Sequence, residues 1–253
     1  MKSLICLVLD RSGSMGGREN DVVNGVNAFI EEQKKLPDPA SIALVRFDSE
    51  ATERFRLMQP LADMKPLAHE EYQPRGGTPL LDAVGKTMAD LDEDWKREQP
   101  DRAIMVIVTD GEENASREFT KDKIKAMIES RQESGKWVFI YLGANVDAFH
   151  EAASMGVHLA NTANYANTEA GVKSMYAAAS ASVISMRATG QVLADNLGGD
   201  IGEDGKLKRK STLPLSSKIQ GTTAVSQSAW IPPAGAAKEG IKKGELPWSP
   251  PAA

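Results

Sequence analysis

Three short segments of the sequence combine hydroxyl or carboxylate side chains with glycine: Asp10-Arg11-Ser12-Gly13-Ser14, Gly76-Gly77-Thr78 and Thr109-Asp110-Gly111. Such oxygens are the ligands that a hard divalent cation prefers, and octahedral Mg²⁺ needs only a few protein ligands beside its waters. We therefore predict one Mg²⁺ site, with Mn²⁺ or Ca²⁺ as alternative ions. Its predicted ligands are the oxygen-bearing side chains of these segments, namely Asp10, Ser12, Ser14, Thr78 and Asp110.

Two of these segments follow apolar runs that have the length of buried strands. Asp10 follows the run over residues 4–9, and Asp110 follows the run over residues 103–108. In a parallel sheet, ligand sites lie beyond the carboxyl ends of the strands, where the direction of winding reverses. We therefore expect the first and fourth strands to be neighbours, with the metal site at their ends.

From residue 3 to about residue 190, apolar runs of strand length alternate with amphipathic segments of helix length. This alternation is typical of a three-layer, doubly wound α/β fold with a mostly parallel central sheet, of the Rossmann-like kind. Residues 48–50 are too short for a helical crossover, so we expect an antiparallel edge hairpin there. The predicted strands are residues 4–9, 42–47, 52–57, 103–108, 137–142 and 158–160, and the predicted helices are 20–36, 80–95, 120–134, 145–155 and 169–189.

The composition changes near the C-terminus. From Glu203 onward, eight lysines and arginines stand against four acidic residues, which is a local charge of +4 in a chain of net charge −5. The pairs Pro232-Pro233 and Pro250-Pro251 favour extended backbone. We predict a domain over residues 1–197 and an extended Pro/Gly/Lys-rich arm over residues 198–253. The arm is either a disordered linker or, through Trp230 and Trp248, an anchor for neighbouring subunits.

The remaining composition excludes several classes of protein. The acidic net charge does not favour a nucleic-acid partner. The single cysteine, Cys6, permits no intramolecular disulfide and no zinc cluster. The apolar run at the N-terminus ends after six residues, which is too short for a signal peptide or a membrane span. We expect a cytoplasmic protein, or a virion protein if a bacteriophage encodes it.

The three segments together resemble the metal-ion-dependent adhesion site of the von Willebrand factor A family. The family pattern Asp-x-Ser-x-Ser matches Asp10, Ser12 and Ser14, the loop threonine matches Thr78, and the Thr-Asp-Gly strand end matches Asp110. The resemblance covers residues 3 to about 190 and suggests an intracellular bacterial or bacteriophage type. It implies that the two serines and the threonine ligate Mg²⁺ directly. It also implies that both aspartates act directly or through water, and that a partner's carboxylate completes the coordination.

The resulting hypothesis is a non-enzymatic, Mg²⁺-dependent module that binds an acidic residue of a protein partner. We expect no catalysis because Ser12 and Ser14 have no base beside them in the sequence, and Gly-Lys-Ser/Thr, which a phosphate-binding loop needs, is absent. One alternative is a structural component of a virion or other large assembly, in which the arm laces neighbouring subunits. A further alternative is a recruiting partner of a hexameric AAA+ ATPase.

Overall fold

The computed structural model describes residues 1–144, 147–190 and 197–210. Within these residues, eight strands form one mixed sheet in the order β3-β2-β1-β4-β5-β6-β7-β8. The central strands run parallel, whereas β3 and β8 are antiparallel to their neighbours at the two edges. The strands are β1 (Ser3–Asp10), β2 (Ala40–Phe47), β3 (Thr52–Pro60), β4 (Arg102–Thr109), β5 (Trp137–Gly143), β6 (Thr162–Tyr165), β7 (Gly199–Ile201) and β8 (Leu207–Arg209).

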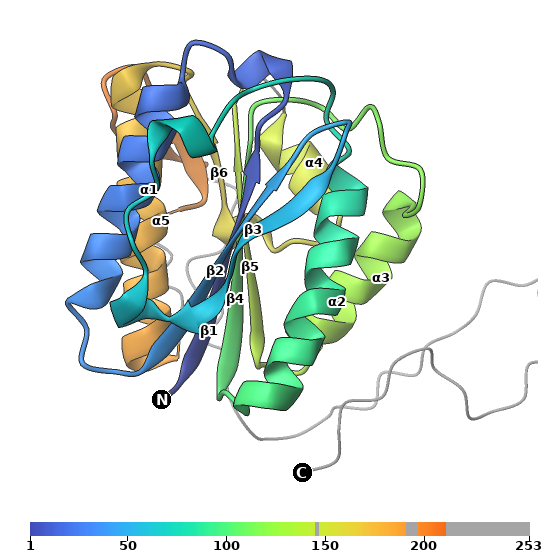
Figure 1. Ribbon diagram of the computed structural model, residues 1–253. Helices are drawn as coiled ribbons and strands as arrows, with labels where there is room; N and C mark the ends of the chain where they lie inside the picture. Colours follow the sequence, from blue (N-terminus) through green and yellow to red (C-terminus); the bar gives the residue numbers. More distant parts are fainter. Residues whose placement is uncertain (145–146, 191–196, 211–253) are drawn as a thin grey trace, which may run out of the picture. The chain divides into compact units, whose positions relative to one another are not determined.

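Helices cover both faces of this sheet (Figure 1). On one face lie α1 (Glu19–Lys34) and α5 (Glu169–Thr189), and on the other lie α2 (Leu80–Glu98), α3 (Lys121–Glu133) and α4 (Ala148–Ser154). Among the described helices, none is both long and apolar enough to cross a bilayer.

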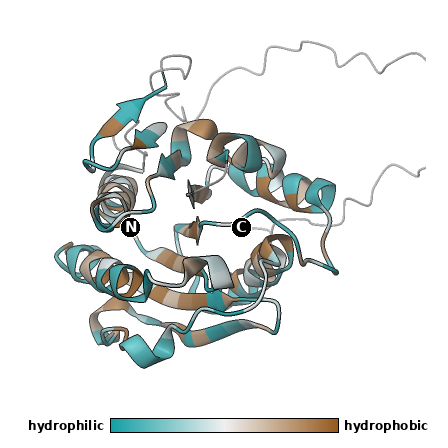
Figure 2. Cartoon of the chain, turned by 90° about the horizontal axis from the view of Figure 1, so that it is seen from above, coloured by the Kyte–Doolittle hydropathy of each residue, from teal (hydrophilic) through white to brown (hydrophobic). Residues whose placement is uncertain are grey.

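Both faces of the central strands are buried, which explains their continuous apolar runs. In β1, alternate side chains enter two separate cores: Ile5 and Leu7 pack on the α1–α5 side, while Leu4 and Cys6 pack on the α2–α3 side. Hydrophobic colour is accordingly frequent along the strands in Figure 2, between helices with hydrophilic outer surfaces. The two cores fix the sheet, and with it the positions of the strand ends.

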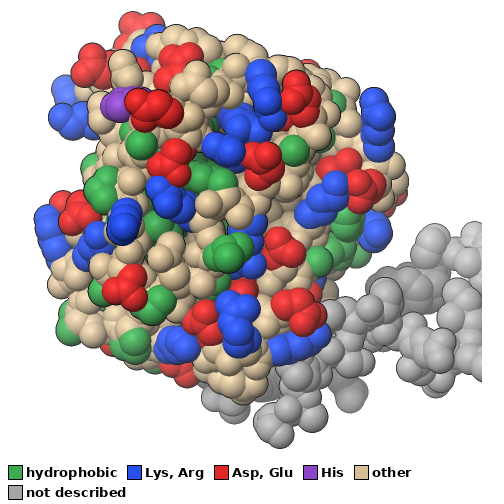
Figure 3. Space-filling view, viewed as in Figure 1, with side chains coloured by type: hydrophobic (Ala, Val, Ile, Leu, Met, Phe, Trp, Pro, Cys, Tyr) green, Lys and Arg blue, Asp and Glu red, His purple; other side chains and the backbone are tan. Residues whose placement is uncertain are grey.

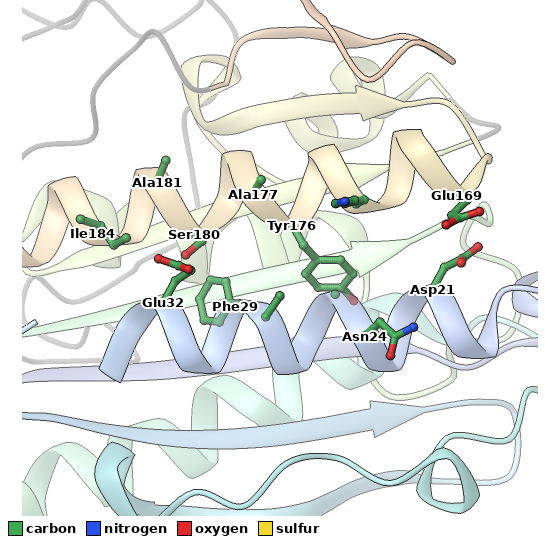
Figure 4. A pocket seen from close by; sticks show the side chains of 13 residues that line it. Asp21, Asn24, Phe29, Glu32, Glu169, Tyr176, Ala177, Ser180, Ala181 and Ile184 are labelled. Carbon is green, nitrogen blue, oxygen red and sulfur yellow. The ribbon is translucent and has the colours of Figure 1, made fainter. Parts of the chain in front are cut away.

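Helices α1 and α5 pack against each other, and a groove of about 640 Å³ lies between them at the surface (Figure 4). The Tyr176 ring lies directly against the backbone of α1 at Gly25. A Cβ atom on Gly25 would fall 2.1 Å from the nearest carbon of this ring. Glycine at position 25 is therefore what permits the close approach of the two helices.

We expect Gly25→Ala to lower the free energy of unfolding by about 1–2 kcal/mol, because the added methyl group overpacks the buried Tyr176 ring at a cost of about 2–3 kcal/mol. The gain in helix propensity, about 1 kcal/mol, offsets only part of this cost. Urea denaturation measures the change. Asn24→Ala, at the exposed neighbouring position on α1, is the control and should change stability by at most about 0.5 kcal/mol. Equal stability of the Gly25→Ala variant and the wild type would contradict the packing argument.

The fold class predicted from the sequence is confirmed. The hairpin of β2 and β3 lies at the sheet edge, β1 and β4 are neighbours, and α5 spans the residues predicted for the last helix. The Thr168 side chain caps α5 by accepting a hydrogen bond from Gly171 N at 3.1 Å.

Between residues 145 and 165, one predicted helix begins later than expected and one predicted strand was wrong. The helix predicted over 145–155 is observed as α4, which begins at Ala148, where Asp147 caps it by accepting a hydrogen bond from His150 N. Residues 145 and 146 lie outside the described residues. The strand predicted over 158–160 is replaced by a 3₁₀ turn, Leu159–Asn161. The strand in this region is instead β6, Thr162–Tyr165, because pairing with β5 and β7 supplies its backbone hydrogen bonds.

The sheet also continues beyond the predicted start of the arm at residue 198. Strand β7 pairs with β6, and β8 folds back on β7, so residues 199–209 extend the sheet. Only residues 211–253 of the predicted arm lie outside the described residues. A truncation meant to remove the arm must therefore begin after Lys210 if the sheet is to stay intact.

Candidate metal centre

The candidate metal centre lies at the carboxyl ends of β1 and β4. Asp10 is the last residue of β1, and Asp110 directly follows β4. These two strands pair in parallel, with Leu9 opposite Val108. From them the chain winds outward in opposite directions, to β2 and β3 on one side and to β5 through β8 on the other. The topology thus brings two carboxylates, 100 positions apart in the sequence, to the switch point of the sheet.

The first loop brings two hydroxyl groups to Asp110. A 3₁₀ turn over Gly13–Met15 follows β1 and sets the direction of the loop. The hydroxyl oxygens of Ser12 and Ser14 lie 3.0 Å apart and share a hydrogen bond. Ser14 Oγ donates to Asp110 Oδ1 at 2.6 Å. Ser12 is buried and Ser14 is exposed, so the row of oxygens runs from the interior to the surface.

Hydrogen bonds fix the orientation of the Asp10 carboxylate next to these hydroxyl groups. Its Oδ1 accepts a hydrogen bond from Ser12 N at 2.7 Å, and its Oδ2 accepts one from Thr109 Oγ1 at 2.6 Å. Its backbone carbonyl accepts from the buried Tyr72 hydroxyl. Burial raises the pKa of Asp10 to about 6, although these side-chain and backbone donors oppose the rise. The carboxylate is therefore oriented by the protein, and it is costly to keep ionised without a further cation.

Thr78 comes from the loop before α2 and is held through its backbone. Thr78 N donates to Asn114 Oδ1 at 2.9 Å, and Asn114 N donates to Thr78 O at 3.1 Å. A Cβ atom on Gly111 would lie 2.9 Å from Thr78 Oγ1 and 3.5 Å from Ser14 Oγ. The two hydroxyl groups therefore flank Gly111, and the absence of a side chain there leaves space between them.

All five sequence-predicted side chains thus gather at one place, and a buried carboxylate oxygen among them has no hydrogen-bond donor in the described part of the chain. Asp110 Oδ2 is buried, and no described residue donates a hydrogen bond to it. Burial raises the pKa of Asp110 above its usual value, even with the hydrogen bond from Ser14. A buried carboxylate oxygen without a donor is costly unless a cation or water satisfies it. This donor set of hydroxyls and carboxylates fits a hard divalent cation.

Glu112 and Glu113, which follow Asp110, have different surroundings. Glu112 is exposed. Glu113 caps α2, because its Oε2 accepts a hydrogen bond from Leu81 N at 2.9 Å while its Oε1 accepts from Ser116 N at 2.8 Å. Glu113 therefore fixes the loop after β4 to the start of α2, the helix that follows Thr78.

Sequence reasoning missed three residues that orient this centre: Thr109, Asn114 and Tyr72. Thr109 belongs to the Thr-Asp-Gly segment, so its position beside Asp110 was a usable signal. Asn114 and Tyr72 gave no signal, because their partners Thr78 and Asp10 lie 36 and 62 positions away. Such contacts follow from the fold alone.

Comparison with known proteins shows a similarity to one domain family. Residues 5–113 match the model of the von Willebrand factor type A domain. Over 150 residues the chain is 29% identical to calcium-activated chloride channel regulator 4 from Homo sapiens. This match covers 57% of this chain and 15% of that protein. Members of this domain family mediate protein–protein interactions.

Two solved structures share the fold. Proximal thread matrix protein 1 from the mussel byssus is 15% identical with a TM-score of 0.50, and the match covers 71% of this chain and 45% of that one. A von Willebrand factor type A protein from Catenulispora acidiphila is 16% identical with a TM-score of 0.51, covering 72% and 42%. The chain therefore spans less than half the length of each of these proteins. The matched region, residues 5–113, contains all three oxygen-bearing segments, and over that region the chain is similar to the von Willebrand factor type A domain.

Proposed function

We propose that this domain binds one divalent cation, with Mg²⁺ as the expected ion, and uses it to bind an acidic residue of a protein partner. Ser12, Ser14 and Thr78 would hold the cation with their hydroxyl oxygens, while Asp10 and Asp110 would contribute carboxylates directly or through water. A cation held largely by neutral hydroxyls keeps much of its positive charge and attracts a carboxylate. The proposed role is binding rather than catalysis.

The observation that carries this proposal is the buried Asp110 Oδ2, which no described residue satisfies, beside a row of hydroxyl oxygens that reaches the surface at Ser14. On the face of the molecule seen in Figure 3, acidic and basic side chains are interspersed. That face therefore offers no continuous basic surface of the kind that nucleic acids require, which supports a protein partner.

Titration of the full chain with Mn²⁺, followed by the loss of the free ion's electron paramagnetic resonance signal, tests the cation site. We expect saturation at one ion per chain and competition by Mg²⁺. Pull-downs with the full chain in Mg²⁺ and in EDTA then test the partner, which should be released by EDTA. A chain that binds no Mn²⁺, or retains its partner in EDTA, would refute the proposal.

Gly111→Ala should weaken Mn²⁺ binding by about tenfold or more, because the new methyl group displaces the Thr78 hydroxyl from its present position. The fold should persist, since Gly111 does not require a positive φ angle. The same Mn²⁺ titration measures the loss. Gly202→Ala, in the turn between β7 and β8, is the control and should keep wild-type affinity. Unchanged affinity in Gly111→Ala would show that Thr78 does not contribute to the site.

A further inference from the structure

The turn between β2 and β3 contacts both loops that bear the predicted hydroxyl ligands. This turn contributes two side chains, Asp48 and Ser49, which we call the turn clamp. Neither residue belongs to the five predicted ligands.

The two loops run side by side. Arg75 N donates to Arg11 O at 2.7 Å, and Gly13 N donates to Gly76 O at 2.9 Å. In the first loop, Ser12 stands between Arg11 and Gly13, the two residues that make these hydrogen bonds. In the second loop, Thr78 follows Gly76 by two residues. Because more than 60 positions separate the loops, chain connectivity does not fix their relative placement. A metal site, however, needs ligand atoms placed to within about 0.5 Å.

Asp48 joins the two loops with one atom. Its Oδ2 accepts hydrogen bonds from Arg11 Nε at 2.6 Å and from Arg75 Nε at 3.0 Å. Its Oδ1 accepts from Glu50 N at 2.7 Å and Ala51 N at 3.1 Å, which fixes the carboxylate to its own turn. Asp48 is 1% exposed and Arg11 is 4% exposed, so this charge pair is shielded from water.

Ser49 holds the second loop from the same side. Ser49 Oγ accepts a hydrogen bond from Gly77 N at 3.0 Å. Gly76 has a φ angle of +66°, and a Cβ atom there would fall 2.2 Å from Ser49 Oγ. Only glycine satisfies both conditions at position 76, so the loop is shaped to lie against the turn clamp two residues before Thr78.

We propose that Asp48 is a positioning residue of the metal centre, which sets the distance between the Ser12–Ser14 loop and Thr78 by holding Arg11 and Arg75 together. This inference rests on the proposed function. In this role Asp48 would contact neither the cation nor the partner and would act through the two arginines.

The test compares Mn²⁺ affinity with stability in the full chain. Asp48→Asn keeps the size of the side chain and removes its charge, and it should weaken Mn²⁺ binding by about tenfold or more. Arg75→Gln removes one of the two arginines from a half-exposed position and should weaken binding in the same direction. This second variant preserves the test if Asp48→Asn fails to fold.

Asp94→Asn is the matched control. Asp94 is also 1% exposed and paired with two arginines, Arg54 and Arg97, but it lies on α2 about 21 Å along the helix from Leu80. This variant should lose stability and keep wild-type Mn²⁺ affinity. Affinity within twofold of wild type in both Asp48→Asn and Arg75→Gln would overturn the proposal, because the turn clamp would then serve stability alone.

Hydrogen exchange without metal separates this proposal from the proposed function. The amides of Arg75 and Gly77 should exchange at least about tenfold faster in Asp48→Asn than in wild type. In Asp94→Asn, their exchange rates should equal those of wild type. If the wild type bound no Mn²⁺, the proposed function would fail, and the exchange rates would still decide whether Asp48 holds the loop. Equal exchange in all three proteins would reject the positioning role.

Discussion

Asp110→Ala is expected to abolish cation binding, and with it cation-dependent partner binding, while the fold persists. Asp110 supplies a carboxylate whose Oδ1 orients the Ser14 hydroxyl at 2.6 Å and whose Oδ2 has no donor among the described residues. The alanine therefore removes both a charge and the group that orients the neighbouring Ser14 hydroxyl, a predicted ligand. Mn²⁺ titration measures the loss of binding, and circular dichroism reports whether the fold is retained.

The fold should persist because burial works against the Asp110 carboxylate in the metal-free protein. Burial raises its pKa, so the ionised side chain costs free energy in the folded state, and alanine removes this cost. Glu112→Ala is the control, since Glu112 is exposed and two positions away. Its Mn²⁺ affinity should stay within about twofold of wild type. Partner binding that survives both Asp110→Ala and EDTA would mean that the partner does not use this centre.

Mg²⁺ is expected to raise the melting temperature of the wild-type chain. A ligand that binds only the folded state stabilises it by about 2.7 kcal/mol at a concentration of 100 times its Kd. For a domain of this size, each kcal/mol corresponds to about 2–4 °C. We therefore expect an increase of roughly 5–10 °C. Differential scanning calorimetry in Mg²⁺ and in EDTA measures it.

The physical reason is the cost that the metal-free centre carries. Asp10 is fully buried, Asp110 is 3% exposed, and burial raises the pKa of both carboxyl groups. A cation between them would offset the cost of keeping both ionised in the interior. NaCl at matched ionic strength should not reproduce the increase, and Asp110→Ala should not show it. A wild-type melting temperature that is independent of Mg²⁺ would contradict both the stabilisation and the proposed site.

The elements that the sequence predicted best are those marked by a local pattern of apolar residues. The apolar run of β1 marks a strand that is buried on both faces, and the period of apolar residues between Thr168 and Gly190 marks α5. The short link between β2 and β3 predicted a hairpin because no helix fits there. Where the pattern was weak, as in β6, prediction placed the strand several residues too early. Strand pairing decided that element, and pairing partners are distant in sequence.

In the candidate metal centre, too, some features were predictable from the sequence and others were decided only by the fold. The sequence by itself determined the five oxygen-bearing side chains, because Asp10 and Asp110 follow buried strands and Ser12, Ser14 and Thr78 stand at recognisable spacings. Only the tertiary structure decided how they are held: Thr109 orients Asp10, Asn114 holds Thr78, and Asp48 joins the two loops. The ligand types are a property of residues, which can be read along the chain. Their relative positions arise when separate segments pack together, so the contacts that fix them appear only in the folded molecule.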